Sequence, residues 1–299
     1  MAAKPLRLAA HDFDAVLEPD FGGLVASLGW THRGRRQDLL YAPAGALPTT
    51  QKTNGFGVWP MVPFANRAFG AVLDDGECRW NLPVNEPEPG NNLHGFGWQA
   101  PWRVEEAGTA QAVLVHTKTE GADPYRYRAQ LAIRLEPGSI HLALEVTNRA
   151  ADTLPFGIGL HPWFVCAPDT VLRMTADGAL TLGPSFRPTG HGKVPCEGDF
   201  SDGRRVFADT ETAWSFTFWD GRAEIRTPSL GLVIAMEASE TLRHPVLWAP
   251  PRAPFVCLEP QSHAIGAPSD KIARDVTPLK RLAPGETLSG WMRLRPSAA

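Results

Sequence analysis

Hydrophobic and polar residues alternate with a period of two along the stretch from residue 125 to residue 147. Every second position from Tyr125 to Leu135 is apolar, and the alternation resumes at Ile140 after a Pro137-Gly138 turn signal. Successive strand residues point to opposite faces, so this pattern predicts a long antiparallel hairpin with one buried face.

Shorter strands are predicted where apolar runs lie beside turn residues. They fall at 78–82, 112–117, 223–226, 232–236, 245–249 and 255–259. The dipeptide Asp220-Gly221 is interpreted as a turn before the strand at 223–226. No stretch longer than about two turns has a 3.6-residue period, and the 28 prolines would interrupt most helices. The pattern favours an all-β protein, namely a large antiparallel β-sandwich with few or no long helices.

The size of the chain is compatible with one large β domain. It has 299 residues and shows neither a repeat of fixed period nor a Ser/Gly linker, so we expect a single domain over residues 1–299. Hydrophobic residues make up 43% of the chain and include 10 Trp and 14 Phe, which is enough apolar surface for a large core.

Charge and cysteine usage argue against several functional classes. The formal net charge is -3, and no basic cluster occurs beyond residues 33–36, so nucleic acid is not an expected partner. The four cysteines form no C-x-x-C pair, which argues against a zinc ribbon or a redox motif. No run of about 18 apolar residues and no signal-like apolar core occur, so we expect a cytoplasmic protein without membrane association. Monomer and homodimer both remain open.

Candidate chemistry is concentrated in four segments that combine titratable or amide side chains with rigid Pro, Gly or aromatic neighbours. These segments are 60–67, 91–95, 159–164 and 257–263. The sequence contains no G-x-S-x-G, no G-x-x-x-x-G-K-[ST] and no H-E-x-x-H. The sequence therefore gives no indication of an α/β-hydrolase nucleophile elbow, a phosphate-binding P-loop or a zinc metalloprotease site.

His161 and Glu259 are the leading candidates for proton transfer. His161 precedes Pro162-Trp163, where burial would lower the pKa of the imidazole and a neighbouring carboxylate would raise it. Glu259 closes an apolar strand just before Pro260, so it stands where the chain leaves the sheet. The alternatives are a structural core histidine and a glutamate that simply pairs with an arginine.

Three further side chains and the tryptophans suggest a binding role. His94 lies in an Asn- and Gly-rich turn, where a spacer role is the alternative. Arg67 follows Asn66 in an otherwise apolar segment, so its guanidinium needs acceptors such as hydroxyl groups or a carboxylate. Tryptophans such as Trp163 can stack on the C–H face of a sugar ring, although a large core would take up most of them.

Taken in order, the four segments resemble the aldose 1-epimerase (galactose mutarotase) family, over roughly residues 21–294. The motifs that carry the resemblance are Pro63-Phe64-Ala65-Asn66-Arg67, Asn92-Leu93-His94-Gly95, Gly159-Leu160-His161-Pro162-Trp163-Phe164 and Cys257-Leu258-Glu259-Pro260. The resemblance implies a galactose-mutarotase-type sandwich, an isomerase that interconverts the α and β anomers of a free aldose, and no metal or organic cofactor.

The resemblance also implies residue roles. Glu259 would be the general base, His161 the general acid, and His94 and Arg67 would bind sugar hydroxyls or the ring oxygen. This mechanism requires an ionised Glu259 and a protonated His161, which their mutual proximity would favour.

One departure from the family pattern concerns a sugar-binding Asp. Its expected position, counted back from Trp219, falls on Ala213, and Asp209 is the nearest replacement, with Asp220 beyond the turn. A branch of the family acts on hexose 6-phosphates and needs clustered arginines, whereas the Asn66-Arg67 segment resembles the branch that acts on free sugars.

Two rival functions remain. A sugar-binding or sugar-sensing sandwich without catalysis would use the same aromatic and polar residues. A glycoside hydrolase or lyase would need two carboxylates that face the scissile bond, and the sequence nominates only Glu259.

Overall fold

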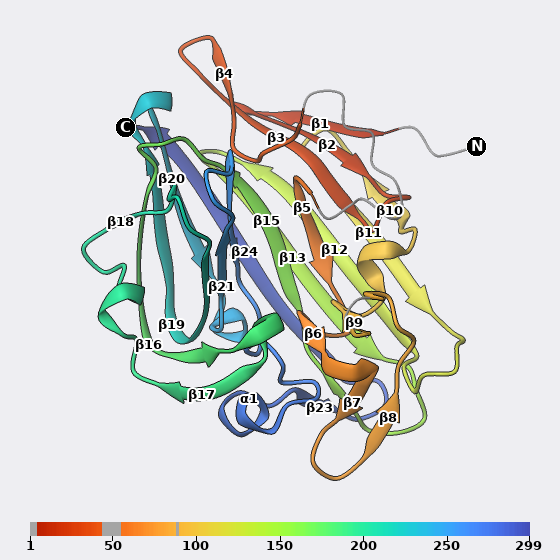
Figure 1. Cartoon of the computed structure of the whole chain (residues 1–299). Coiled ribbons are helices and arrows are strands. Elements are labelled where there is room, and N and C mark those ends of the chain that lie inside the picture. Colours follow the sequence, from red (N-terminus) through yellow and green to blue (C-terminus); the bar gives the residue numbers. More distant parts are fainter. Residues whose placement is uncertain (1–4, 44–54, 88–89) are drawn as a thin grey trace.

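The computed structural model describes residues 5–43, 55–87 and 90–299, and β-strands dominate this part of the chain (Figure 1). The α-helix in it is α1 (Lys271–Val276). No helix among the described residues is long and apolar enough to cross a membrane. The predicted all-β class is confirmed.

The predicted hairpin is confirmed and forms the middle of an outer layer. Leu135 of β12 (Tyr127–Glu136) lies opposite Ile140 of β13 (Ser139–Asn148), and Gly138 takes a positive φ of 73° in the turn. The strands of this outer layer, in pairing order and including the hairpin, are β10 (Arg103–Ala107), β11 (Gln111–Lys118), β12, β13, β24 (Thr287–Ala298) and β20 (Leu232–Ala238).

A second, inner layer carries the strands that contain His161 and Glu259. Its pairing order is β1 (Leu6–Ala10), β2 (Phe13–Glu18), β3 (Leu24–His32), β5 (Val58–Met61), β15 (Gly159–Val165), β22 (Phe255–Glu259) and β21 (Val246–Ala249). As predicted, β22 ends at Glu259, directly before Pro260. The two layers form an antiparallel β-sandwich.

The long strand β19 (Thr212–Thr227) belongs to both layers. Its first residues pair with β21 and its last residues pair with β20, while β16 (Val171–Leu182) lies along its other edge. The prediction of a turn at Asp220-Gly221 that separates two strands is wrong. The strand continues through these residues with a register shift against β16, because Gly221 supplies a positive φ of 85° that lets the backbone bulge.

Short elements complete the described part. The short strands are β4 (Arg35–Asp38), β6 (Arg67–Ala68), β7 (Val72–Asp74), β8 (Arg79–Asn81), β9 (Asn92–Leu93), β14 (Leu154–Phe156), β17 (Pro188–Gly192), β18 (Arg204–Arg205) and β23 (Lys280–Leu282). One-turn 3₁₀ segments lie at Phe69–Ala71, Gly97–Gln99, Pro184–Phe186, Cys196–Gly198, Pro228–Leu230 and Glu240–Leu242.

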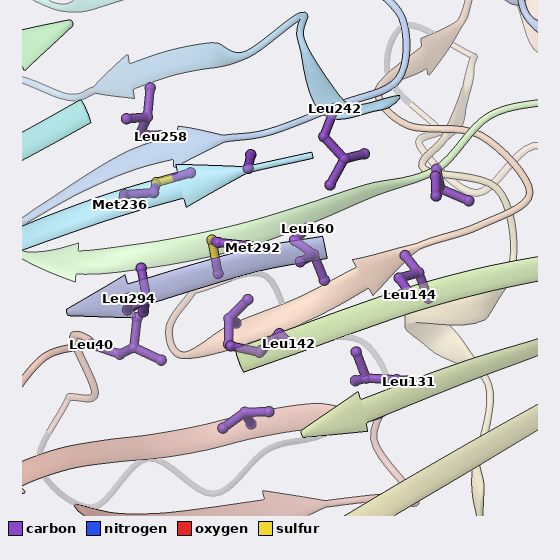
Figure 2. Packing of buried hydrophobic residues seen from close by; sticks show 14 of the residues in the cluster. Leu40, Leu131, Leu142, Leu144, Leu160, Met236, Leu242, Leu258, Met292 and Leu294 are labelled. Atoms are coloured by element: carbon purple, nitrogen blue, oxygen red, sulfur yellow. The ribbon is translucent and has the colours of Figure 1, made fainter. Parts of the chain in front are cut away.

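The hydrophobic core fills the space between the layers. Leu160 of β15 and Leu258 of β22 are fully buried there, and Leu142, Met236 and Met292 of the outer strands belong to the same cluster (Figure 2). Residues alternate in direction along a strand, so the neighbours of these leucines, His161 and Glu259, point to the opposite face of the inner layer. The requirement to bury leucine thus orients the two polar side chains away from the core.

Candidate active site

The register of the inner layer brings His161 and Glu259 into facing positions. Trp163 pairs with Cys257, and Gly159 forms a bridge with Gln261, so His161 lies opposite Glu259 on the adjacent strand. On its other side His161 pairs with Trp59 of β5. The two residues, 98 positions apart in the chain, therefore meet as cross-strand neighbours.

A cleft of about 330 Å³ opens over this face of the sheet. Its lining residues are Trp59, Asn66, Arg67, Glu86, Leu93, His94, His161, Trp163, Leu182, Phe186, Glu211, Ala213, Trp214, Val246, Leu247, Trp248, Glu259 and Ile265. Six of the seven residues predicted for the site lie among them, and Asp209 does not.

One close contact and one hydrogen bond define the geometry of the His161–Glu259 pair. His161 Nε2 lies 3.3 Å from Glu259 Oε1, and Gln261 Nε2 donates to the other carboxylate oxygen, Oε2, at 2.9 Å. His161 is 7% exposed and Glu259 3% exposed. The carboxyl group is thus held from one side by an amide and presents its other oxygen to the imidazole.

Burial decides where the proton of this pair resides. Desolvation raises the pKa of Glu259 to about 8, against the opposing effects of Gln261 and Arg67. Desolvation lowers the pKa of His161 to about 3. At neutral pH the pair therefore carries one proton, held on the carboxyl group. The expected ionised Glu259 and protonated His161 are not the resting form, because loss of water disfavours both charges.

His94 is oriented as a neutral donor toward the cleft. The backbone N–H of Asn66 donates to His94 Nδ1 at 2.9 Å, and the His94 N–H donates to the Asn66 carbonyl at 2.8 Å. Burial holds the pKa of His94 well below its ordinary value. Since Nδ1 accepts, the ring proton resides on Nε2, which leaves an N–H for a ligand oxygen.

Arg67 is fixed by Glu86, a residue that the sequence analysis missed. Arg67 Nε and Nη2 donate to the two carboxylate oxygens of Glu86 at 3.2 and 3.0 Å. Both side chains are 19% exposed and both line the cleft. Such a two-point contact holds the guanidinium plane in one orientation.

Aromatic rings form the walls around the pair. The His161 ring stacks between Trp59 at 4.3 Å and Trp163 at 5.5 Å between centroids. The indole nitrogens of both tryptophans are buried and have no hydrogen-bond partner within the described residues. The aromatic surroundings explain the strong desolvation and offer flat apolar surfaces to a ligand.

The structure does not bring Asp209 into the cleft. Its side chain is 78% exposed and accepts a hydrogen bond from Arg252 Nε at 2.7 Å. Ala213, where an Asp was expected, does line the cleft. The carboxylate nearby is Glu211, two residues earlier, which also lines the cleft and accepts a hydrogen bond from Trp248 Nε1 at 2.9 Å. A period-two count back from Ala213 would have found it.

One group of three potential metal ligands occurs in the described part of the chain. His161, Cys257 and Glu259 place their ligand atoms within 4.8 Å of one another. Cys257 is fully buried and is not among the residues that line the cleft.

A family model described as aldose 1-epimerase matches residues 9–295. The Escherichia coli K12 protein described as uncharacterized protein YphB is 32% identical over 252 residues, which cover 79% of this chain and 82% of that protein.

Solved structures support the fold. A crystal structure from Escherichia coli K12, provisionally described as an aldose 1-epimerase, is 27% identical with a TM-score of 0.85, and the match covers 99% of both chains. A galactose mutarotase-like protein from Clostridium acetobutylicum has a TM-score of 0.86 at 22% identity, over 98% of this chain and 95% of that one. The latter likeness concerns the fold alone.

Proposed function

Since the chain belongs to the aldose 1-epimerase family, we propose that it interconverts the α and β anomers of a free aldose, with Glu259 as base and His161 as acid. The observation that carries this proposal is the 3.3 Å contact between His161 Nε2 and Glu259 Oε1 at the floor of an aromatic cleft. One acid and one base side by side are what opening and closing a hemiacetal ring requires.

The reaction conserves the single proton of the pair. In the reactive form the proton resides on His161 and Glu259 is a carboxylate, a form that the positive charge of Arg67 favours by lowering the pKa of Glu259. Glu259 takes the proton from the anomeric hydroxyl while His161 gives its proton to the ring oxygen. The bond between C1 and the ring oxygen breaks and a C1 carbonyl forms. Rotation about C1–C2 and reversal of both transfers yield the other anomer.

The remaining cleft residues suit a polyhydroxylated ligand. The Nε2–H of His94 and the guanidinium of Arg67 are donors for sugar oxygens. The carboxylates of Glu86 and Glu211 are acceptors, and the indoles provide stacking surfaces. This mixture of donors, acceptors and aromatic faces supports a sugar rather than an apolar ligand.

The charges of the cleft favour an unphosphorylated sugar. Arg67 is the only lysine or arginine among the described lining residues, and Glu86 already neutralises it. A phosphate dianion would need several unpaired cations at the same place.

The position of Gln261 supports an acid–base role for Glu259 in the sugar reaction proposed here. Its amide donates to Glu259 Oε2 at 2.9 Å and leaves Oε1 facing His161 Nε2. Glycoside hydrolysis would instead place a second carboxyl group across the scissile bond, whereas the group that faces Glu259 at 3.3 Å is an imidazole.

Polarimetry on freshly dissolved α-glucose and α-galactose tests the proposal. The expected result is mutarotation well above the buffer rate, which Glu259→Gln abolishes while sugar binding, measured by tryptophan fluorescence, is retained. A protein that binds the sugar but leaves mutarotation at the buffer rate would instead be a sugar-binding module. Release of new reducing ends from oligosaccharides would overturn the proposal in favour of a hydrolase.

A further inference from the structure

The group of His161, Cys257 and Glu259 follows from strand register. Cys257 lies two residues before Glu259 on β22, so both side chains point to the same face, and Trp163, its cross-strand partner, is two residues after His161. The imidazole nitrogen, the thiol sulfur and a carboxylate oxygen lie within 4.8 Å of one another. Three different types of ligand atom therefore lie close together at the cleft.

We propose that these three side chains form a binding site for a thiophilic divalent cation such as Zn²⁺ or Cd²⁺, and that the bound ion blocks the cleft to sugar. The site shares His161 and Glu259 with the proton transfers proposed above and adds Cys257 to them. The ion binding stands on its own geometry, and only the inhibition rests on the proposed function.

The distances are close to those of a tetrahedral site. Zn–N, Zn–O and Zn–S bonds of about 2.0–2.3 Å place neighbouring ligand atoms roughly 3.3–3.6 Å apart. His161 Nε2 and Glu259 Oε1 are already 3.3 Å apart. No two of the three ligand atoms are more than 4.8 Å apart, so an inward movement of at most roughly 1–1.5 Å brings the set to tetrahedral separations. Three protein ligands leave a fourth position, toward the cleft, for water.

The ligand set also selects the kind of ion. A thiolate beside an imidazole favours Zn²⁺, Cd²⁺ and other soft cations, whereas Mg²⁺ and Ca²⁺ require oxygen ligands. Binding releases the thiol proton of Cys257 and the proton of the carboxyl pair to solvent. The resulting thiolate and carboxylate balance the charge of the ion within the buried site.

The expected consequence is competitive inhibition. The ion would occupy the lone pair of His161 Nε2 and the carboxylate of Glu259, the two groups that exchange protons with the sugar. A sugar and the ion therefore exclude one another, and saturating sugar should relieve the inhibition.

The test uses Cd²⁺ titration, followed by the thiolate-to-metal charge-transfer absorption in the ultraviolet, in a chain with Cys78→Ser and Cys196→Ser. These two exposed cysteines would otherwise bind the ion on the surface. We expect one Cd²⁺ per chain, loss of the band in Cys257→Ala, and an unchanged band in Cys166→Ala, which removes the other buried thiol. Cys257→Ser, with circular dichroism, controls for misfolding of the alanine variant.

Inhibition is measured in parallel. Zn²⁺ should slow mutarotation by the parent protein, which is the chain with Cys78→Ser and Cys196→Ser. Cys257→Ala should need at least tenfold more Zn²⁺ for the same inhibition. Mg²⁺ should not inhibit. A parent protein without the band, or a band that survives in both Cys257 variants, overturns the site. If the band depends on Cys257 but the protein shows no mutarotase activity, the metal site stands and the proposed function fails.

Discussion

His161 and Glu259 face each other from adjacent antiparallel strands, and their functional atoms, Nε2 and Oε1, lie 3.3 Å apart. Both are buried, and each is flanked in its own strand by a leucine that faces the core. The sheet thus holds the two side chains as one unit rather than as two independent loop residues.

The first prediction concerns this unit. His161→Asn and Glu259→Gln should each lower kcat by about 10²–10⁴-fold, the usual contribution of a positioned acid or base. The kcat of the double variant should be only a little lower than that of either single variant, because each change alone already prevents the paired proton transfers. His141→Asn on the outer strand β13 is the matched control and should retain full activity. Independent, multiplicative losses in the polarimetric assay would contradict a shared proton.

The pH profile of kcat/KM is the second prediction. Because burial raises the pKa of Glu259 to about 8, the pair keeps its one proton below that pH and loses it above, so activity should fall on the alkaline side near pH 8. Burial lowers the pKa of His161 to about 3, so no acid limb should occur near the ordinary histidine value of about 6.5.

Substitution of Gln261 tests whether the alkaline limb of that profile reports the titration of Glu259. Its amide donates to Glu259 Oε2 and lowers the pKa of the carboxyl group. Gln261→Met removes the donor at similar volume, so the alkaline limb should move to higher pH. If the limb stays in place or moves to lower pH, it does not report the titration of Glu259.

A third prediction tests Glu211 as an acceptor for sugar hydroxyls. Glu211→Gln should raise KM roughly tenfold or more with little change in kcat, since a hydrogen bond to a charged group contributes about 1.5–3 kcal/mol. The exposed Glu197, which does not line the cleft, provides the control Glu197→Gln. A fall in kcat at constant KM would instead assign Glu211 to the chemical step.

The Arg67–Glu86 pair gives a fourth prediction. Glu86→Gln removes the two-point anchor of the guanidinium, so KM for a free aldose should rise several-fold. The same change leaves the charge of Arg67 unbalanced, so inorganic phosphate should become a better competitor. Glu237→Gln, which breaks a comparable pair with Arg295 on the outer layer, should alter neither quantity.

The stability of the inner layer gives a fifth prediction. Leu258 is fully buried between the layers, so Leu258→Ala should lower the free energy of unfolding by about 2–5 kcal/mol through lost contacts and an unfilled cavity. Denaturant titration measures this loss. A cost below about 1 kcal/mol would mean that the layers collapse around the site.

Local sequence patterns predicted much of the fold. The hairpin of β12 and β13 and the end of β22 at Glu259-Pro260 depend on alternation and turn residues only a few positions apart. The Asp220-Gly221 segment was misinterpreted because turn residues also serve a bulge, and only the pairing of β19 with β16 distinguishes the two.

The site was harder to predict from local signals, because its geometry depends on register between distant strands. His161 and Glu259 could be nominated from their motifs, but their facing positions follow from pairing across 98 residues. Asp209 was chosen by residue type. Its exposed ion pair with Arg252, and the inward direction of Glu211, depend on where β19 begins.

The alternation of Leu160 with His161 and of Leu258 with Glu259 restricts how this protein can diverge. Insertion or deletion of a single residue within β15 or β22 would exchange the two faces of the strand. A leucine would then point into the cleft, and His161 or Glu259 would point into the hydrophobic core. Cleft residues that lie outside these two strands, such as the segment around Glu86 and the residues that lead into β19, are free of this constraint. Changes in substrate range are therefore expected there.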